Sequence, residues 1–468
     1  MASSRPHGAA ALAPLLLLLV SSCTSGRREP DDEPIEWADW TFPREPAGSP
    51  FGAPASEPDE AEALPDLTAE GAGIDELLRY ARRNNPGLAA AFERWRAAAE
   101  VSGRVTALPD PAFRFTGYLE EVETRIGPMQ ARVGFSQALP WFGTLSAAGR
   151  MADRQAAAAL ALLEAERWKL EERVRKAWYE MAWLEEAIAV AEGHRELLTY
   201  WESVARSRME VGLGSHADVL RAQVELGKIQ DRVESLTDLR RPLAAKLNAA
   251  LGRPSEAPLP PPDRALPTPP AIDEQALLAH LTETSPELLA LTERVHAAEE
   301  GIVLAEKSFY PNFTVGADYT FVGSAANPGT KGSGDDAFAV TIGLTLPIQR
   351  GAKRSRLRET EAALRAARHA VDEAANRLAS ALEESLYHLR DGDRRAELYR
   401  GGLIPKGEES LQSLDTGYQS GDEDFGDLID AQRVLLEFQL QAVRAEADRA
   451  EALAETERLT GLRLHEDH

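Results

Sequence analysis

The chain has 468 residues and a formal net charge of −24. This acidic balance argues against a nucleic-acid-binding protein, which needs a basic surface to contact phosphates. A hydrophobic fraction of 43% and a charged fraction of 27% are typical of a folding chain rather than a disordered one. The length allows two to four ordinary domains.

Residues 1–22 have the features of a signal peptide. Arg5 supplies a positive charge, and the apolar run 9–20 is too short to span a bilayer as a helix. Cys23, the single cysteine of the sequence, follows two small residues as in a bacterial lipobox, and Thr24 after it indicates the outer membrane. We expect Cys23 to be lipidated and to anchor the chain to a membrane without spanning it. The alternative is an unused thiol in a cleaved signal.

Residues 23–72 are rich in Pro, Glu, Gly and Ala and are expected to form an extended tether. After the tether, the chain is duplicated, with a first repeat at 73–252 and a second at 273–461. A Pro-rich linker, 253–272, separates the repeats, and a short tail, 462–468, ends the chain. At a constant offset of 200, identical residues recur from Pro86, Leu88, Glu93, Arg94, Ala97, Ala98, Glu100, Pro111 and Phe113.

Each repeat is expected to contain the same helices. A helix of about 30 residues comes first, at 74–107 and 273–308. A very long helix follows a strand pair, at 145–210 and 352–417, and a returning helix comes after a glycine turn, at 217–251 and 425–461. Apolar residues at 3-4 spacing predict helix-on-helix packing, in rods of about 100 Å at 1.5 Å per residue. We expect no proline to break either long helix.

The strand pairs span 112–139 and 312–347. In 312–322 and 337–347, apolar residues alternate with polar or small ones over about ten residues, the length of a tilted transmembrane β-strand. The alternative is a hairpin of a β-sandwich, with one face packed on the core and the other face in water. Four strands cannot close a barrel, and an open sheet edge cannot sit in hydrocarbon. A membrane barrel must therefore be shared, with 4 × 2 = 8 strands from two chains or 4 × 3 = 12 from three.

Several segments resemble the TolC-like outer-membrane efflux proteins, which are the exit ducts of tripartite exporters. These segments are NPGLAAA, ALPDPAF, SQALPWFGTL and VGLGSHADVLRAQ, with their second-repeat counterparts. The resemblance implies a mainly α fold: a homotrimer whose long helical hairpins form an α-barrel below a shared 12-stranded β-barrel. It also implies a passive duct for small molecules or metal ions, in the outer membrane and periplasm, that works with a periplasmic adaptor and an inner-membrane pump. SQALPWFGTL is most similar to the branch that serves heavy-metal exporters of the resistance-nodulation-division class.

In this resemblance, the turns at 211–216 and 417–424 are the periplasmic tips of two helical hairpins. Gly212 in the first turn and Asp218 just after it recur at Gly421 and Asp427, at an offset of 209. We expect glycines to permit the positive φ that ends a helix and lets the chain reverse; these are Gly212, Gly214, Gly417 and Gly421.

The second tip is acidic, and the resemblance assigns roles to its residues. Asp427 and Asp430 match two aspartates that ring the closed aperture, and such rings favour cations. The alternative is that acids near a helix start only cap it. Tyr418 matches a tyrosine that bonds an aspartate of the first tip, here Asp218. Glu423 stands where the family has a linking arginine, so this second link is absent or built differently.

No catalytic motif or metal-ligand set stands out: GxSxG, P-loop and HExxH patterns are missing and the nine histidines are scattered. We expect no enzyme activity, cofactor or resident metal. The rival to a duct is a non-channel coiled-coil periplasmic lipoprotein, either an adaptor or a structural spacer. Two duplicated hairpins and few strands favour the duct.

Overall fold

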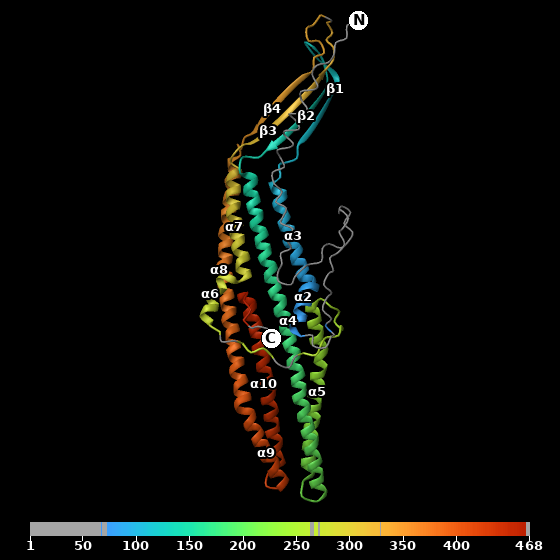
Figure 1. Ribbon diagram of the computed structural model, residues 1–468, viewed down its shortest axis with the longest axis vertical. Helices are drawn as coiled ribbons and strands as arrows, with labels where there is room; N and C mark the ends of the chain where they lie inside the picture. Colours follow the sequence, from blue (N-terminus) through green and yellow to red (C-terminus); the bar gives the residue numbers. More distant parts are fainter. Residues whose placement is uncertain (1–66, 68–72, 263–265, 270–271, 328, 465–468) are drawn as a thin grey trace. The chain divides into compact units, whose positions relative to one another are not determined.

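The computed structural model describes residues 67, 73–262, 266–269, 272–327 and 329–464. The expected signal peptide, Cys23 and nearly all of the tether lie outside the described residues. Figure 1 shows the strands at one end of the described helices and the two hairpin turns at the other. None of the described helices combines the length and the hydropathy that crossing a membrane requires.

Each repeat opens with two short helices instead of the single one that the sequence predicted. Helices α2 (Ile74–Asn84) and α3 (Pro86–Thr106) replace the first, and α6 (Glu274–Thr284) and α7 (Pro286–Lys307) replace the second. The prediction was wrong because proline restricts the residue before it to extended backbone. Asn85 and Ser285 accordingly have ψ of 119° and 117°. Each proline then starts the next helix, where a missing N–H is tolerated.

The strands lie close to their predicted positions and form one antiparallel sheet in the order β1-β2-β3-β4. They are β1 (Ala112–Thr124), β2 (Gly127–Leu139), β3 (Asn312–Val322) and β4 (Ala337–Thr345). Directly paired residues of adjacent strands share a face of the sheet. Phe113 pairs with Phe135, Phe135 with Ala317, and Ala317 with Val340, so one face is apolar across all four strands. The other face is polar or small, with contacts such as Arg132 to Thr320 and Thr341 to Asp318.

The two long helices differ. In the first repeat, α4 (Thr144–Glu210) is continuous, whereas the second repeat has α8 (Arg350–Glu397), a π-helical segment η1 (Leu398–Leu403) and α9 (Ile404–Ser420). The prediction of an unbroken second helix overlooked Pro405. Because Pro405 lacks a backbone N–H, it cannot continue the regular i to i−4 ladder, and the chain changes to the wider π geometry just before it. The returning helices are α5 (His216–Leu251) and α10 (Phe425–Thr460).

Glycines end both returning helices and repeat the same contact. Gly252 and Gly461 have φ of +72° and +69°. A Cβ on Gly252 would lie 2.7 Å from the carbonyl oxygen of Asn84, and one on Gly461 would lie 2.9 Å from that of Thr284. Each glycine thus lets the end of a repeat pack against the break between that repeat's two opening helices.

Gly461→Ala is expected to lower the free energy of unfolding by about 1–2 kcal/mol, because an L side chain is strained in the left-handed region. Gly193→Ala is the matched control: Gly193 lies inside α4, and nothing surrounds the position of its Cβ within 4 Å. This control is expected to stabilise the helix slightly. Thermal unfolding followed by circular dichroism measures both, and equal effects of the two variants would contradict the argument.

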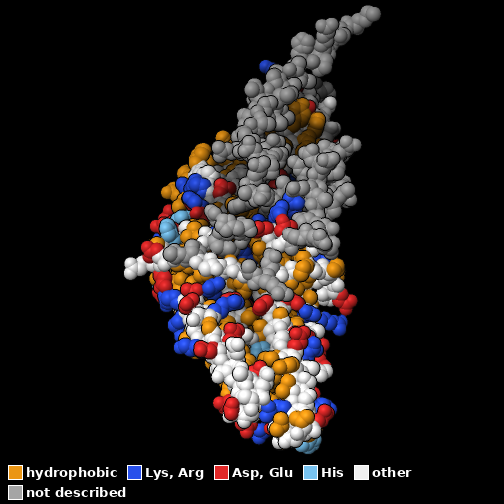
Figure 2. Space-filling view, turned by 60° about the horizontal axis from the view of Figure 1, so that its bottom comes forward, with side chains coloured by type: hydrophobic (Ala, Val, Ile, Leu, Met, Phe, Trp, Pro, Cys, Tyr) orange, Lys and Arg blue, Asp and Glu red, His pale blue; other side chains and the backbone are white. Residues whose placement is uncertain are grey.

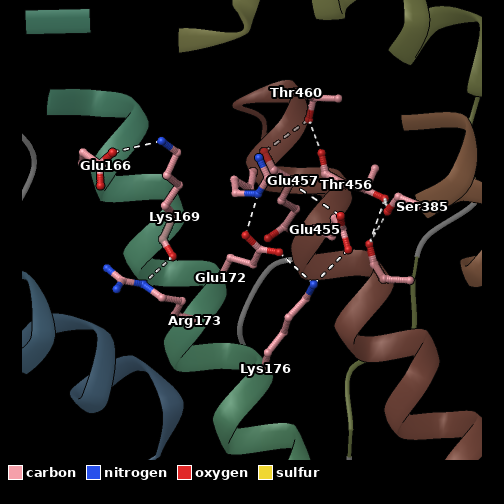
Figure 3. Close-up of polar contacts among 12 residues, drawn as sticks. Glu166, Lys169, Glu172, Arg173, Lys176, Ser385, Glu455, Thr456, Glu457 and Thr460 are labelled. Carbon is pink, nitrogen blue, oxygen red and sulfur yellow. Dashed lines mark hydrogen bonds and ion pairs between the residues drawn. The ribbon is translucent and has the colours of Figure 1, made fainter. Parts of the chain in front are cut away.

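Charged side chains join the repeats where α4 packs on α10. Lys176 of α4 lies 2.8 Å from Glu172 and 2.9 Å from Glu455 of α10, as Figure 3 shows. The preceding residue, Arg175, forms an ion pair with Glu457 of α10, and both side chains are nearly inaccessible, at 2% and 1% exposure. The interface between the repeats therefore contains a buried ion pair as well as apolar packing.

Candidate functional site

The first tip joins α4 to α5. Gly212 has a φ of +75°, and the backbone N–H groups of Leu213 and Gly214 donate to the carbonyl of Arg208 at 2.8 and 3.0 Å. Ser215 then caps α5 through a reciprocal pair of hydrogen bonds with Asp218. This capping box satisfies two backbone donors at the helix start, so Asp218 has a structural role in the tip.

The second tip joins α9 to α10 with the same design. Gly421 has a φ of +91°, and the carbonyl of Gly417 accepts from the N–H groups of Gly421 and Asp422 at 2.9 and 2.8 Å. Asp424 caps α10 by accepting from the N–H of Gly426. Of the acids in this tip, Asp424 therefore has the capping role that the sequence left as an alternative.

The four tip glycines divide into two kinds. Gly212 and Gly421 have positive φ as expected, but Gly214 and Gly417 do not, so the expectation was wrong for this second pair. Their small size is needed for close packing instead. A Cβ on Gly214 would lie 3.0 Å from Cβ of Arg208, and one on Gly417 would lie 2.4 Å from Cγ of Glu423.

Two arginines of the first hairpin hold the tips together. Arg208 donates to the backbone carbonyl of Gln419 at 2.7 Å, and its guanidinium lies 4.9 Å from the ring centroid of Tyr418. Arg221 lies 3.4 Å from Asp424 and 4.0 Å from Asp218. Neither residue was predicted from the sequence. Complementary charge could have indicated them, because residues 415–432 contain six acids and no Lys or Arg, and the acids therefore need cations from another segment.

Replacing Arg208 with alanine is expected to widen the separation of the tips more than Arg221→Ala does. Arg208 contributes a hydrogen bond and a cation–π contact, together about 1–2 kcal/mol. The Arg221 pair is solvent-exposed and contributes at most about 1 kcal/mol. Distances between spin labels at positions 213 and 422 measure the separation. An unchanged distance distribution in Arg208→Ala would contradict this role.

Tyr418 and Asp218 are neighbours, but they do not bond to each other in the described part of this protomer. Tyr418 is buried against Phe425, with ring centroids 5.0 Å apart, and its hydroxyl has no hydrogen-bond partner among the described residues. Burial raises the pKa of Tyr418, the nearby Asp218 carboxylate raises it further, and Arg208 opposes the shift. Glu423 is exposed, with its methylenes over Gly417.

Asp427 and Asp430 are both exposed on α10. Asp430 lies 2.8 Å from Arg433, which also pairs with Glu225 of α5. Asp427 forms no ion pair with a described residue. Each carboxylate is therefore placed to face an aqueous space or a neighbouring molecule, and Asp427 carries the less compensated charge.

A buried histidine joins the hairpins above the tips. His194 of α4 lies between two glutamines of α10: its Nδ1 is 2.9 Å from Nε2 of Gln432, and its Nε2 is 2.8 Å from Oε1 of Gln439. Burial lowers the pKa of His194, which favours the neutral ring that accepts from one glutamine and donates to the other. Gln432, which repeats Gln223, is thus a structural residue in the second hairpin.

The sequence model of the family described as "Outer membrane efflux protein" matches residues 77–253 and 277–462. The chain belongs to the outer membrane efflux protein family. The two matched segments carry the family's domain twice, which explains the repeated tips and junctions. A search of curated protein sequences found no match.

Solved structures show the same fold. VceC, an outer membrane protein of Vibrio cholerae, is similar at 18% identity and a TM-score of 0.69, over 83% of this chain and 96% of VceC. A membrane protein from Pseudomonas aeruginosa is similar at 19% identity and a TM-score of 0.70, over 87% of this chain and 99% of that protein. The MtrE outer membrane channel of Neisseria gonorrhoeae, in its open state, is similar at 20% identity and a TM-score of 0.67, over 84% of this chain and 89% of MtrE.

This efflux protein is thus an outer-membrane channel, and the prediction of an exit duct for a tripartite export system is confirmed by the family. The rival prediction of a non-channel lipoprotein is not favoured. Among the described residues, no group of three or more His, Cys, Asp and Glu side chains is placed to hold a metal ion.

Proposed function

We propose that three copies of this efflux protein assemble into a passive duct across the outer membrane and periplasm. The four strands of each copy contribute to a shared 12-stranded β-barrel, and the helical hairpins form an α-barrel beneath it. Small molecules or metal ions pass through the duct, and the tips of the hairpins meet a periplasmic adaptor that connects to an inner-membrane pump. Cys23 adds a lipid anchor.

The sheet is the observation that carries this proposal. Its apolar face is solvent-exposed in the protomer: Ile342 is 77% exposed and Phe113 is 70% exposed. Its edge strands, β1 and β4, each pair on one side only. In hydrocarbon, every backbone polar group needs a partner, so both edges must meet other strands. An apolar face toward lipid and a polar face toward a lumen fit a barrel shared between copies.

The tips support the adaptor contact. Val211 and Leu213 lie at the turn of the first tip and are both 70% exposed. A bound adaptor would cover these two apolar side chains. Figure 2 shows acidic and basic side chains mixed over the helical surface, as expected for helices in water.

The test is the state of the purified full-length protein. We expect a trimer on cross-linking in detergent, heat-modifiable migration in gels, and single-channel conductance in planar bilayers. A monomer that salt or alkali releases from membranes, without conductance, would contradict the duct and restore the rival lipoprotein. Labelling with radioactive palmitate in the wild type and in Cys23→Ser tests the lipid anchor separately.

A further inference from the structure

A basic segment begins directly after the sheet. Residues 346–358 (LPIQRGAKRSRLR) contain five cations and no acid, in a chain with 76 acidic and 52 basic residues. The cations are Arg350, Lys353, Arg354, Arg356 and Arg358. All but the half-buried Lys353 are exposed, and none forms an ion pair with a described residue.

This arrangement is unfavourable within the protomer. The five cations occupy the N-terminal turns of α8, whose first turn has no acid and whose N-cap, Gln349, makes no side-chain hydrogen bond. Of these cations, Arg350 and Lys353 lie in the first turn and oppose the helix dipole, whose effect is confined to that turn. The charge of this segment is therefore left for an anion outside the protomer to balance.

At the start of α4, the corresponding long helix of the first repeat, the arginines are paired. Arg150 and Arg154, near the start of α4, lie 2.9 and 3.1 Å from Glu300 and Glu293 of α7. On the other side of α7, pairing with α8 begins only at Arg368, 2.9 Å from Glu299. Near the starts of the two long helices, Arg150 and Arg154 of α4 are thus paired, whereas the five cations of α8 are not paired with any described residue.

The segment also lies at the end of the apolar face of the sheet. Leu346 and Ile348, between β4 and α8, are 61% and 82% exposed. The register pairs Leu139 with Phe313 and Asn312 with Thr345, so the connections after β2, before β3 and after β4 lie at one level. Trp141 and Tyr310 stack there, with centroids 5.0 Å apart. Exposed aromatic and apolar side chains next to cations are typical of a membrane–water boundary.

We propose that Arg350, Arg354 and Arg358 bind the phosphate groups of anionic phospholipids in the leaflet that faces the helices. Their spacing of four residues places the three guanidinium groups on one side of α8, in a stripe that runs away from the sheet. Arginine forms bidentate contacts with phosphate. This proposal rests on the proposed function, in which the sheet is embedded in the membrane.

The test compares lipids retained by the purified full-length protein in native mass spectrometry, after delivery of equal amounts of phosphatidylglycerol and phosphatidylcholine. The wild type is expected to prefer phosphatidylglycerol. The variant Arg350→Gln/Arg354→Gln/Arg358→Gln is expected to lose that preference by on the order of a hundredfold, since each cation near an anionic surface contributes roughly fivefold. The control Arg150→Gln/Arg154→Gln/Arg368→Gln, which removes three arginines paired with α7, is expected to keep it.

Any of four outcomes would overturn the proposal. The wild type binds both lipids equally, or the first variant retains the preference. Alternatively, inorganic phosphate alone displaces the lipid at matched concentration, which assigns the stripe to free phosphate. Finally, the first variant dissociates into monomers that still prefer phosphatidylglycerol, which assigns the stripe to a contact between copies. Failure of the proposed function is distinguishable, because the wild type itself would then be a monomer without conductance.

Discussion

Replacing Arg175 with methionine is expected to destabilise the folded protein by about 3–5 kcal/mol, the usual effect of removing one partner from a buried ion pair. Methionine fills the space of the arginine stem but leaves the carboxylate of Glu457 without this guanidinium. Glu457 also accepts a hydrogen bond from the backbone N–H of Leu464 at 2.8 Å. The loss is thus expected to loosen both the contact between the repeats and the chain end packed beside it.

The matched control is Lys176→Met, one residue along the same helix. Lys176 is 28% exposed, and partly exposed pairs contribute at most about 1 kcal/mol. The double variant Arg175→Met/Glu457→Leu removes both buried charges and is expected to recover most of the lost stability. Thermal unfolding of the purified protein measures all three. Equal destabilisation by Arg175→Met and Lys176→Met would contradict a special role for the buried pair.

The sequence predicted the elements whose pattern is local. Alternation over ten residues located the strands within a few residues, and the 3-4 spacing located the long helices. The breaks at Pro86, Pro286 and Pro405 were present in the sequence but were outweighed by strong helical periodicity on both sides. At Pro86 and Pro286 a local steric contact restricts the residue before the proline, and at Pro405 a backbone N–H is missing. Periodicity measures neither effect.

The tip contacts and the buried ion pair could not be derived in the same way. Arg175 stands among many Glu and Arg residues of α4, and only the packing of α10 on α4 distinguishes it from its exposed neighbours. Likewise, Arg221 and Asp424 are 203 positions apart in a duplicated chain, and their tips meet only because the hairpins share one core. The recurrence of Gly212 at Gly421 predicted two similar turns. The contact between the turns depends instead on residues that differ between the two repeats, with arginines in the first hairpin and acids in the second.

Neutralising the second tip with Asp427→Asn/Asp430→Asn is expected to reduce the preference of the channel for cations by roughly tenfold. In the proposed trimer, three copies of both residues place 2 × 3 = 6 carboxylates around one axis, and a ring of one sign concentrates counter-ions. The ratio of potassium to chloride permeability in planar bilayers, measured from reversal potentials, gives the effect. The effect is expected to weaken at high salt, where exposed charges are screened.

The structure predicts which of the two single variants lowers cation preference more. Asp430 is already paired with Arg433 at 2.8 Å, whereas Asp427 has no ion pair with a described residue, so Asp427→Asn is expected to have the larger effect. The control Asp231→Asn/Glu234→Gln removes the same charge with the same three-residue spacing from exposed positions on α5. If this control lowers selectivity as much as the tip variant, the preference arises from the overall negative charge. If Asp430→Asn alone has the larger effect, Arg433 does not compensate Asp430 in the assembled channel, and the exposed pair seen in the protomer is broken on assembly.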